Sequence, residues 1–335
     1  MKKLAIGVDI GGINTAFGLV DENGDLYAES VISTKKYPYV DDYPAYVEDL
    51  CDSMRALAQS LSFEYELTGI GIGAPNANYH KGTIETPANL WKFKEGDPNP
   101  DESRRVFPLA DDISKCFGGV KTLITNDANA ATIGEMIYGN AKGMRDFIMI
   151  TLGTGLGSGF VANGEMVYGH DGFAGEFGHI PFFDNEKICA CGKKGCLETE
   201  VSGIAIEEKI CSLIEKGVNT ILREKYDRKE PIHIDDIIAA AKNDDNLSIE
   251  LIEEAGEKIG KAVAFLINIF NPETVIVGGN MAAAGDYIML PLKSSTNKYS
   301  LNLVYKDTKF RLSKLNENAN AWGVAMLIRN QVIGL

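Results

Sequence analysis

The segment Gly175-Glu-Phe-Gly-His179, followed by Cys189-Ala-Cys191-Gly-Lys-Lys-Gly-Cys196-Leu-Glu198, brings three thiols and one imidazole into a short stretch of chain. Three cysteines and one histidine form a complete tetrahedral ligand set for zinc, and a set without an open position is typical of a structural ion. The segment is rich in Lys and Gly and has no apolar periodicity, so it is a poor candidate for ordinary buried core. The sequence therefore predicts a structural zinc site made by His179, Cys189, Cys191 and Cys196.

Two acidic residues lie just outside this ligand set. Glu176 precedes the histidine by three positions, and Glu198 follows the last cysteine by two. A rigid zinc loop would hold both carboxylates in a fixed relation to His179. Such a cluster is suited to binding a molecule with many hydroxyl groups.

Composition places the chain among ordinary globular proteins. Its 335 residues are 45% hydrophobic and 24% charged, enough for one large or two ordinary domains. The net charge of -14 opposes binding to the phosphate backbone, so we expect no nucleic-acid partner. No stretch reads as a signal peptide or a membrane span, and the three cysteines outside the zinc loop are scattered. These features predict a cytoplasmic protein with reduced thiols and no membrane partner.

A glycine pair separates two apolar strands near the N-terminus. The strand Leu4–Asp9 leads into Gly11-Gly12, and a second strand runs from Thr15 to Asp21. Bare backbone amides in such a tight hairpin can face an anion, although a plain turn would have the same sequence. The preceding carboxylate, Asp9, can hold a hydrated magnesium ion beside a bound phosphate.

Asparagines and one aspartate follow further expected strands. Asn76 comes after the strand Leu67–Gly73, and Asn89 lies a little further on. Ligands of α/β sheets bind at strand ends, where amides can bond hydroxyl groups, but asparagine is also a common turn residue.

Asp127 lies between the strand 120–125 and a helix-forming segment. It reads as the N-cap of that helix, as a general base whose ionised form the helix N-terminus favours, or as both together.

A second glycine-rich hairpin lies in the middle of the chain. Residues 153–159, Gly-Thr-Gly-Leu-Gly-Ser-Gly, separate two strands and form an approximate internal repeat of the first hairpin. The segment lacks the lysine and the following helix of a Walker loop. Two such hairpins could clamp a triphosphate between two similar domains. Gly278-Gly279, after the buried strand Thr274–Val277, allows a flat ligand such as a nucleoside to come close, or forms only a turn.

These stretches, in this order, resemble the ROK family of sugar kinases and sugar-responsive repressors, within the actin and hexokinase superfamily. The resemblance implies an α/β fold with two actin-like (ribonuclease H-like) lobes, each a mixed sheet flanked by helices, and Asp127 as the catalytic base. It implies that sugar hydroxyls bind to Asn76, Asn89, Asn126, Asp127, Glu176, His179 and Glu198. It implies that ATP binds to Asp9, Gly11, Gly12, Asn14, Thr15, Gly153, Thr154, Gly155, Gly157, Gly278 and Gly279, with Mg²⁺ held through water by Asp9.

The sequence departs from the family pattern at two positions. Ile13 stands where the family usually has threonine, which removes a hydroxyl near the transferred phosphoryl group. Asn76 stands where glycine is commoner, which bears on sugar specificity. The family's repressors carry a helix-turn-helix domain before the sugar-binding part, and this chain starts directly with its first strand, so a kinase is expected.

The expected activity is the ATP-dependent phosphorylation of a hexose, with glucose as the leading substrate and sugar 6-phosphate as the product. Fructose, mannose, allose and N-acetylhexosamines are alternative substrates, and an inactive sugar-binding sensor is the alternative function that Ile13 favours. We expect a small lobe of residues 1–123 and 318–335, and a large lobe of residues 124–317 with the zinc loop 179–196. The family resemblance implies a homodimer or homotetramer.

Overall fold

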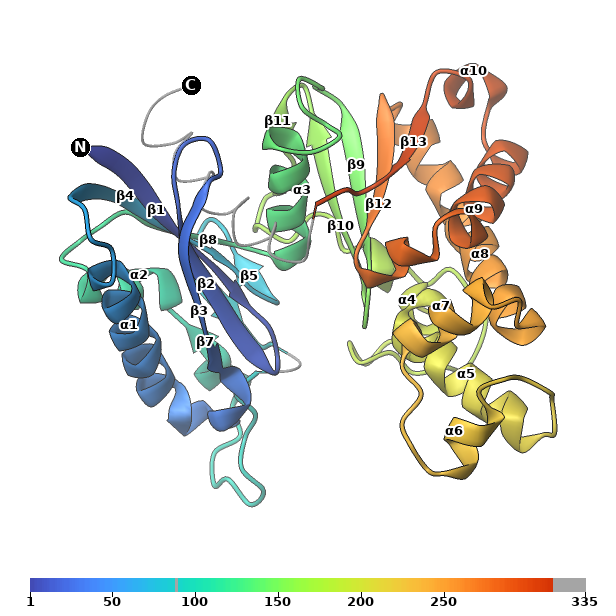
Figure 1. Ribbon diagram of the computed structural model, residues 1–335, viewed down its shortest axis with the longest axis horizontal. Coiled ribbons are helices and arrows are strands. Elements are labelled where there is room, and N and C mark those ends of the chain that lie inside the picture. Colours follow the sequence, from blue (N-terminus) through green and yellow to red (C-terminus); the bar gives the residue numbers. More distant parts are fainter. Residues whose placement is uncertain (88–89, 316–335) are drawn as a thin grey trace. The chain divides into compact units, whose positions relative to one another are not determined.

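The computed structural model, shown in Figure 1, describes residues 1–87 and 90–315. The chain divides into two compact units, and each has its own five-stranded mixed sheet. The first unit contains residues 1–143 and 166–174, and the second contains residues 144–165 and 175–314. The two-lobed mixed α/β architecture expected from the sequence is confirmed.

The sheet of the first unit has the strand order β3-β2-β1-β4-β8. Strands β1, β2 and β3 form an antiparallel meander. Strand β4 pairs in parallel with β1, and β8 pairs in parallel with β4. Leu4, Ile6 and Val8 alternate along β1, and their apolar side chains are completely buried. The strand bounds are β1 Lys2–Ile10, β2 Asn14–Val20, β3 Leu26–Ser33, β4 Tyr65–Gly73 and β8 Thr122–Thr125.

Helices and a small second sheet complete this unit. Helix α1 packs its apolar face, with Tyr46, Leu50 and Met54, into the same core as the residues of β1 (Figure 1). Strands β5, β6 and β7 form a three-stranded antiparallel sheet, and Phe107 of β7 packs against the ring of Trp91. The bounds are α1 Tyr43–Gln59, α2 Leu109–Cys116, α3 Asp127–Ile137, β5 Ala77–Asn78, β6 Thr83–Glu85 and β7 Val106–Phe107.

The sheet of the second unit repeats the same plan in the order β11-β10-β9-β12-β13. An antiparallel hairpin of β9 and β10 is extended in parallel by β12 and β13. The repeat predicted from the two glycine hairpins is therefore a repeat of sheet topology. The strand bounds are β9 Phe147–Leu152, β10 Leu156–Ala162, β11 Glu165–Met166, β12 Thr274–Gly278 and β13 Lys309–Leu312.

Helices α8 and α9 lie against each other in this unit (Figure 1). Buried Ile259, Val263 and Ile267 give α8 an apolar stripe at helical spacing, which is why this segment is a long helix. Asp245 caps its first turn by accepting a hydrogen bond from the Ser248 amide. The helix bounds are α4 Glu198–Val201, α5 Gly203–Glu215, α6 Arg223–Asp227, α7 Ile234–Lys242, α8 Asn246–Phe270, α9 Asp286–Tyr299 and α10 Asn302–Tyr305.

The boundary between the units differs from the one expected at residues 123 and 124. The first unit extends to Gly143 because α3, which follows β8 directly, packs on β4 of the first sheet. Residues 166–174 also belong to the first unit, where Tyr168 stacks on Tyr79 with ring centroids 4.0 Å apart. The segment 318–335 of the expected small lobe lies outside the described residues. Among the described residues, no helix has the length and apolar character needed to cross a membrane.

Candidate functional site

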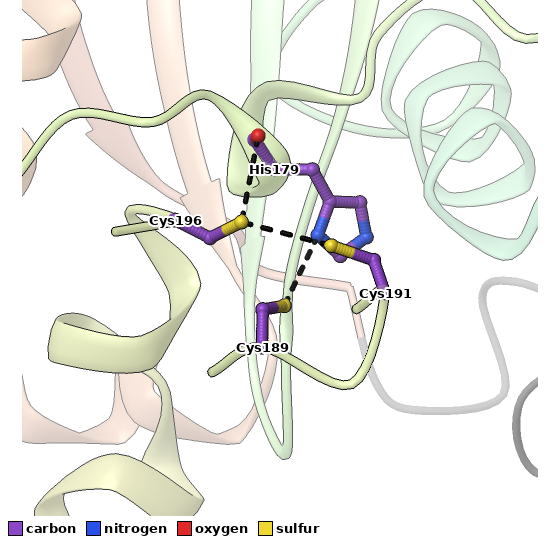
Figure 2. A group of neighbouring side chains, drawn as sticks. All are labelled: His179, Cys189, Cys191 and Cys196. Atoms are coloured by element: carbon purple, nitrogen blue, oxygen red, sulfur yellow. Dashed lines mark hydrogen bonds between the residues drawn. The ribbon is translucent and has the colours of Figure 1, made fainter. Parts of the chain in front are cut away.

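Figure 2 shows the predicted zinc ligands gathered in one cluster in the second unit. Their ligand atoms all lie within 4.8 Å of one another. The Cys191 and Cys196 sulfurs are 3.7 Å apart, and the Cys189 sulfur is 3.5 Å from His179 Nδ1. Gly192 and Gly195 both have positive φ, and a Cβ on Gly195 would lie 2.1 Å from the Phe183 carbonyl oxygen. Glycine is therefore required at Gly195 for the loop to fold back on itself.

These separations fit a tetrahedral zinc ion. Zn–S bonds of about 2.3 Å and Zn–N bonds of about 2.0 Å place two thiolates about 3.8 Å apart and a thiolate about 3.5 Å from an imidazole nitrogen. The sulfur–sulfur distance of 3.7 Å and the sulfur–nitrogen distance of 3.5 Å agree with both values. The donor set, three thiols and one imidazole with no carboxylate, also suits zinc better than a hard cation.

His179 presents its two ring nitrogens to different partners. Nδ1 faces the cysteine sulfurs (Figure 2). Nε2 lies 3.7 Å from the Glu176 carboxylate. Both side chains are partly exposed. A zinc ion on Nδ1 would fix the ring orientation and leave Nε2 with its proton, directed away from the metal.

Glu198 lies between the cluster and the second glycine hairpin. One carboxylate oxygen, Oε2, accepts a hydrogen bond from the Leu156 amide at 2.8 Å, and the other, Oε1, lies 3.7 Å from the Cys189 sulfur. A Cβ on Gly155 would lie 2.6 Å from Oε2, so only glycine leaves room for this contact. The sequence predicted Glu198 as a hydroxyl-binding group, and the structure adds this bond to the hairpin backbone.

The predicted nucleotide motif lies beside the same hairpin. Gly278 pairs with Thr151 of β9, and a Cβ on Gly279, at φ +80, would lie 2.2 Å from the Leu152 carbonyl oxygen. Gly153, Thr154 and Gly155 form the tip, where the Gly153 amide donates to the Gly155 carbonyl at 3.0 Å. Within the second unit, Gly157, Gly278, Gly279 and the hairpin tip are thus close together.

Asn280 was not predicted as a site residue from the sequence. Its Oδ1 is buried without a hydrogen-bond partner in the described part of the chain and faces Gly153, 3.5 Å from where a Cβ would lie. A buried acceptor of this kind is costly unless a ligand or water satisfies it. Asn280 directly follows the Gly278-Gly279 pair, and this position could have marked it as a ligand-binding residue. Asparagine after glycine is also common in turns, so the sequence alone does not single it out.

In the first unit, sheet register brings Asp9 and Asp127 to one edge. Asp9 pairs with Gly73 of β4, and Gly73 pairs with Thr125 of β8, two residues before Asp127. Since β1, β4 and β8 are parallel, their carboxyl ends meet at this edge. Asn76, the first hairpin and Asn126 also follow these strand ends.

Asn126, rather than Asp127, is the N-cap of α3. The Asn126 Oδ1 accepts a hydrogen bond from the Ala128 amide at 2.8 Å, so the N-cap interpretation of Asp127 is wrong. Asp127 is the first helical residue, and its Oδ1 also lies 2.7 Å from the Ala128 nitrogen. The Ala128 amide is thus shared between the Asn126 side chain, which caps the start of the helix, and Oδ1 of Asp127.

The carboxyl groups of Asp9 and Asp127 both have raised pKa values. Burial, and then the charge of Asp127, raise the pKa of Asp9 to about 7. Burial also raises the pKa of Asp127, and the Ala128 amide opposes this rise without cancelling it. The amides at the helix N-terminus favour the ionised form, as expected, but desolvation of the carboxylate is the larger effect and the net pKa is raised.

The first hairpin is stabilised by a backbone hydrogen bond at its tip and by the buried side chain of Thr15. The Gly11 amide donates to the Asn14 carbonyl at 2.9 Å, and the Thr15 hydroxyl is fully buried, 2.8 Å from the hydroxyls of Thr34 and Tyr46. The Thr15 side chain therefore stabilises the hairpin from inside the core. Gly12 and Asn14 are exposed at the tip, and the Ile13 side chain is 67% exposed.

Asn76 adopts the left-handed conformation, with φ of 54°. Glycine and asparagine tolerate this region best, which explains why asparagine can replace the commoner glycine here. Its amide nitrogen lies 3.3 Å from the Thr86 carbonyl oxygen, so the side chain braces the turn. Asn89 lies outside the described residues.

Replacing Asp9 with asparagine is expected to stabilise the protein at alkaline pH. The folded-state pKa of Asp9, about 7, exceeds the ordinary value of 3.8, so stability falls as pH rises between these values and stays low above them. The neutral amide in the Asp9→Asn variant carries no such penalty. Thermal unfolding should therefore show a Tm gain of several degrees at pH 8 that shrinks toward pH 4.

Asp21→Asn is the matched control for this measurement. Burial tends to raise the pKa of Asp21, but hydrogen bonds from Asn23, Tyr27 and Asp25 outweigh it, so that this pKa is lowered. Its removal should therefore lower Tm at pH 8. A Tm gain at pH 8 from both substitutions would contradict the assigned origin of the Asp9 effect.

Comparison with known proteins identifies the family. The model of the ROK family matches residues 5–331, nearly the whole chain. The chain belongs to the ROK family. This ROK protein is 31% identical to a glucokinase of Halalkalibacterium halodurans over 97% of its own length and 95% of that protein. It is 30% identical to a glucokinase of Thermotoga maritima over the full length of both.

The family also includes regulators, and this ROK protein is similar to them. It is 33% identical to a xylose repressor of Caldicellulosiruptor bescii, matching 79% of this chain and 64% of the repressor. Among solved structures, a ROK transcriptional regulator homologous to the Escherichia coli MLC protein is 26% identical, with a TM-score of 0.86 over 100% of this chain and 80% of the regulator. A glucokinase from Streptomyces griseus, solved with glucose and AMPPNP, is 28% identical, with a TM-score of 0.77 over 98% and 99% of the two chains.

Proposed function

We propose that this protein is an ATP-dependent hexose kinase with glucose as the leading substrate. The observation that carries the proposal is Asp127, a carboxylate with a raised pKa at the carboxyl edge of a parallel sheet. Asn126 supplies the helix cap, and Asp127, which contacts the Ala128 amide through Oδ1, would accept the proton on its second oxygen, Oδ2. Similarity to glucokinases along the whole chain supports the same activity.

In this proposal Asp127 takes the proton from the sugar hydroxyl as that oxygen attacks the γ-phosphorus of ATP. A base with a pKa closer to neutrality than an ordinary carboxyl group is better matched to this task. Phosphoryl transfer requires little covalent chemistry from the protein, so positioning and charge neutralisation supply most of the acceleration. Mg²⁺, held through water by Asp9, would neutralise phosphate charge.

The remaining predicted residues have binding roles in this proposal. Backbone amides of Gly11, Gly12 and the hairpin at 153–155 would contact phosphates, and Gly278-Gly279 would lie beside the nucleoside. Sugar hydroxyls would bind to Asn76, Asn89, Asn126, Glu176, His179 and Glu198. Zinc on the Cys3His cluster would orient the acceptor-binding groups, since a closed ligand set leaves no position for substrate.

The proposal is tested by measuring ADP release with a panel of sugars. Glucose, mannose, fructose, allose and N-acetylated hexosamines are each supplied with ATP and Mg²⁺, and the product of the best substrate is identified by mass spectrometry. The expected result is a clear preference for one hexose, with phosphate on its 6-hydroxyl. Tight sugar binding by calorimetry with no ADP release from any sugar would contradict kinase activity.

That second outcome would favour a sugar-binding sensor or regulator. Two observations support this alternative: similarity to ROK regulators and the apolar side chain of Ile13 at the tip of the first hairpin. The similarity to the repressor covers 64% of that protein. The ADP-release assay separates the two functions because a sensor requires sugar affinity but no phosphoryl transfer.

Ile13→Thr is expected to raise the turnover of the kinase by roughly 10-fold or more. The Ile13 carbonyl accepts a hydrogen bond from the Lys35 amide at 3.1 Å, so the backbone is fixed while the side chain points outward. A hydroxyl here could donate to a phosphate oxygen, and one such hydrogen bond to a charged group contributes about 1.5–3 kcal/mol. Ile13→Val, which has no hydroxyl, is the control. Equal turnover for both variants would show that the missing hydroxyl is unimportant.

A further inference from the structure

We propose that Glu198 is a positioning residue that holds the second glycine hairpin in its nucleotide-binding form and connects it to the zinc loop. This inference rests on the proposed function, because it assumes that the hairpin at 153–156 binds phosphate. The role is distinct from sugar binding, since it concerns the Leu156 amide rather than a substrate hydroxyl.

Two hydrogen bonds join the hairpin to the segment that follows the last cysteine. The Leu156 amide donates to Glu198 Oε2 at 2.8 Å, and the Gly203 amide donates to the Gly153 carbonyl at 2.7 Å. These two bonds hold both arms of the tip. A glycine-rich tip would otherwise sample many backbone conformations, and ordering it at the moment of binding would reduce nucleotide affinity.

The hairpin is shaped to receive this carboxylate. A Cβ on Gly155 would lie 2.6 Å from Glu198 Oε2, and a Cβ on Gly203 would lie 2.8 Å from the Gly153 carbonyl oxygen. A larger residue at Gly203 would clash with the backbone, and one at Gly155 would displace the carboxylate from its present position. Such close fitting indicates a specific contact between α4, the start of α5 and the hairpin.

The same carboxylate reaches the metal cluster. Glu198 Oε1 lies 3.7 Å from the Cys189 sulfur, which donates to it as a thiol. A zinc-bound thiolate has no proton to donate, so metal binding would leave Oε1 free to accept a hydrogen bond from a sugar hydroxyl. Oε2 keeps the Leu156 amide in either case. One side chain would thus serve the hairpin with one oxygen and the sugar with the other.

Two substitutions separate the reach of the side chain from its charge. Glu198→Gln keeps the chain length and an acceptor oxygen but removes the charge, whereas Glu198→Asp keeps the charge but shortens the side chain by one methylene. The probe is Mg·ADP, titrated calorimetrically into zinc-loaded protein without sugar. We expect E198D to bind ADP on the order of 10-fold more weakly than wild type, because a hydrogen bond to a charged acceptor is lost. E198Q should stay within about 3-fold of wild type.

Glu200→Gln is the matched control on the same helix. Glu200 bonds to Lys187 and Lys258, away from the hairpin, so its replacement should leave ADP affinity unchanged. Zinc content and Tm are measured for every variant, and amide hydrogen exchange at Leu156 should be faster in E198D than in E198Q. Equal ADP affinity and equal Leu156 exchange in wild type and E198D would overturn only the role of Glu198. Failure of the wild-type protein to bind ADP would overturn this inference together with the proposed function.

Discussion

Asp127→Asn is expected to lower the turnover number by roughly 10²- to 10⁴-fold, the usual size of a general-base contribution. Asparagine has the same shape but cannot accept the hydroxyl proton. Asn126 caps α3 independently, so the helix should be retained. Steady-state kinetics with the best sugar measures the effect, and zinc content and calorimetric sugar affinity should remain close to those of wild type.

Asp111→Asn is the matched control for this substitution. Asp111 lies in the first turn of α2, as Asp127 lies in the first turn of α3, but it is exposed to solvent. Its loss should leave turnover unchanged. Full activity in Asp127→Asn would exclude Asp127 as the base, and an equal loss in both variants would indicate a general effect of charge at helix N-termini.

Cys191→Ser, or removal of the metal by a chelator, is expected to lower stability and sugar affinity together. Zinc binding supplies part of the folding free energy of the loop, so Tm should fall by roughly 5–15 °C. Sugar affinity should fall because zinc fixes the ring of His179, whose Nε2 lies 3.7 Å from Glu176. Differential scanning calorimetry, metal analysis and sugar titration measure the three quantities on the same samples.

Cys211→Ser is the control for the loss of a thiol. Cys211 lies on α5 and does not belong to the metal cluster. Its replacement should change neither zinc content nor sugar affinity. Unchanged sugar affinity in a folded, demonstrably zinc-free protein would show that the metal does not organise the acceptor-binding groups.

The ligand set of the zinc site could be predicted from the sequence because its members are close along the chain. Three cysteines and one histidine within residues 179–196 have little freedom to lie apart, and Gly195 allows the loop to close. Most strands and amphipathic helices were also predictable from local periodicity, as in α1 and α8. The internal repeat of the two glycine hairpins could also be predicted, whereas the strand order of the two sheets is known only from the structure.

Other features depend on contacts between distant segments. The sequence could not distinguish a cap from a base at Asp127, because that choice depends on whether the adjacent Asn126 turns its side chain onto the Ala128 amide. The raised pKa of Asp127 depends on burial by residues from elsewhere in the chain, which local sequence does not encode. The extension of the first unit to Gly143 likewise depends on α3 packing against β4.

Glu198 illustrates the same division. Its position two residues after Cys196 marked it as a group that the zinc loop would hold in place, which is a property of the sequence. Its bond to the Leu156 amide, 42 residues earlier in the chain, exists only because the folded β9–β10 hairpin brings that amide to the start of α4. Local spacing determined the residues and the metal chemistry, whereas tertiary packing decided which atoms of those residues remain available for a ligand.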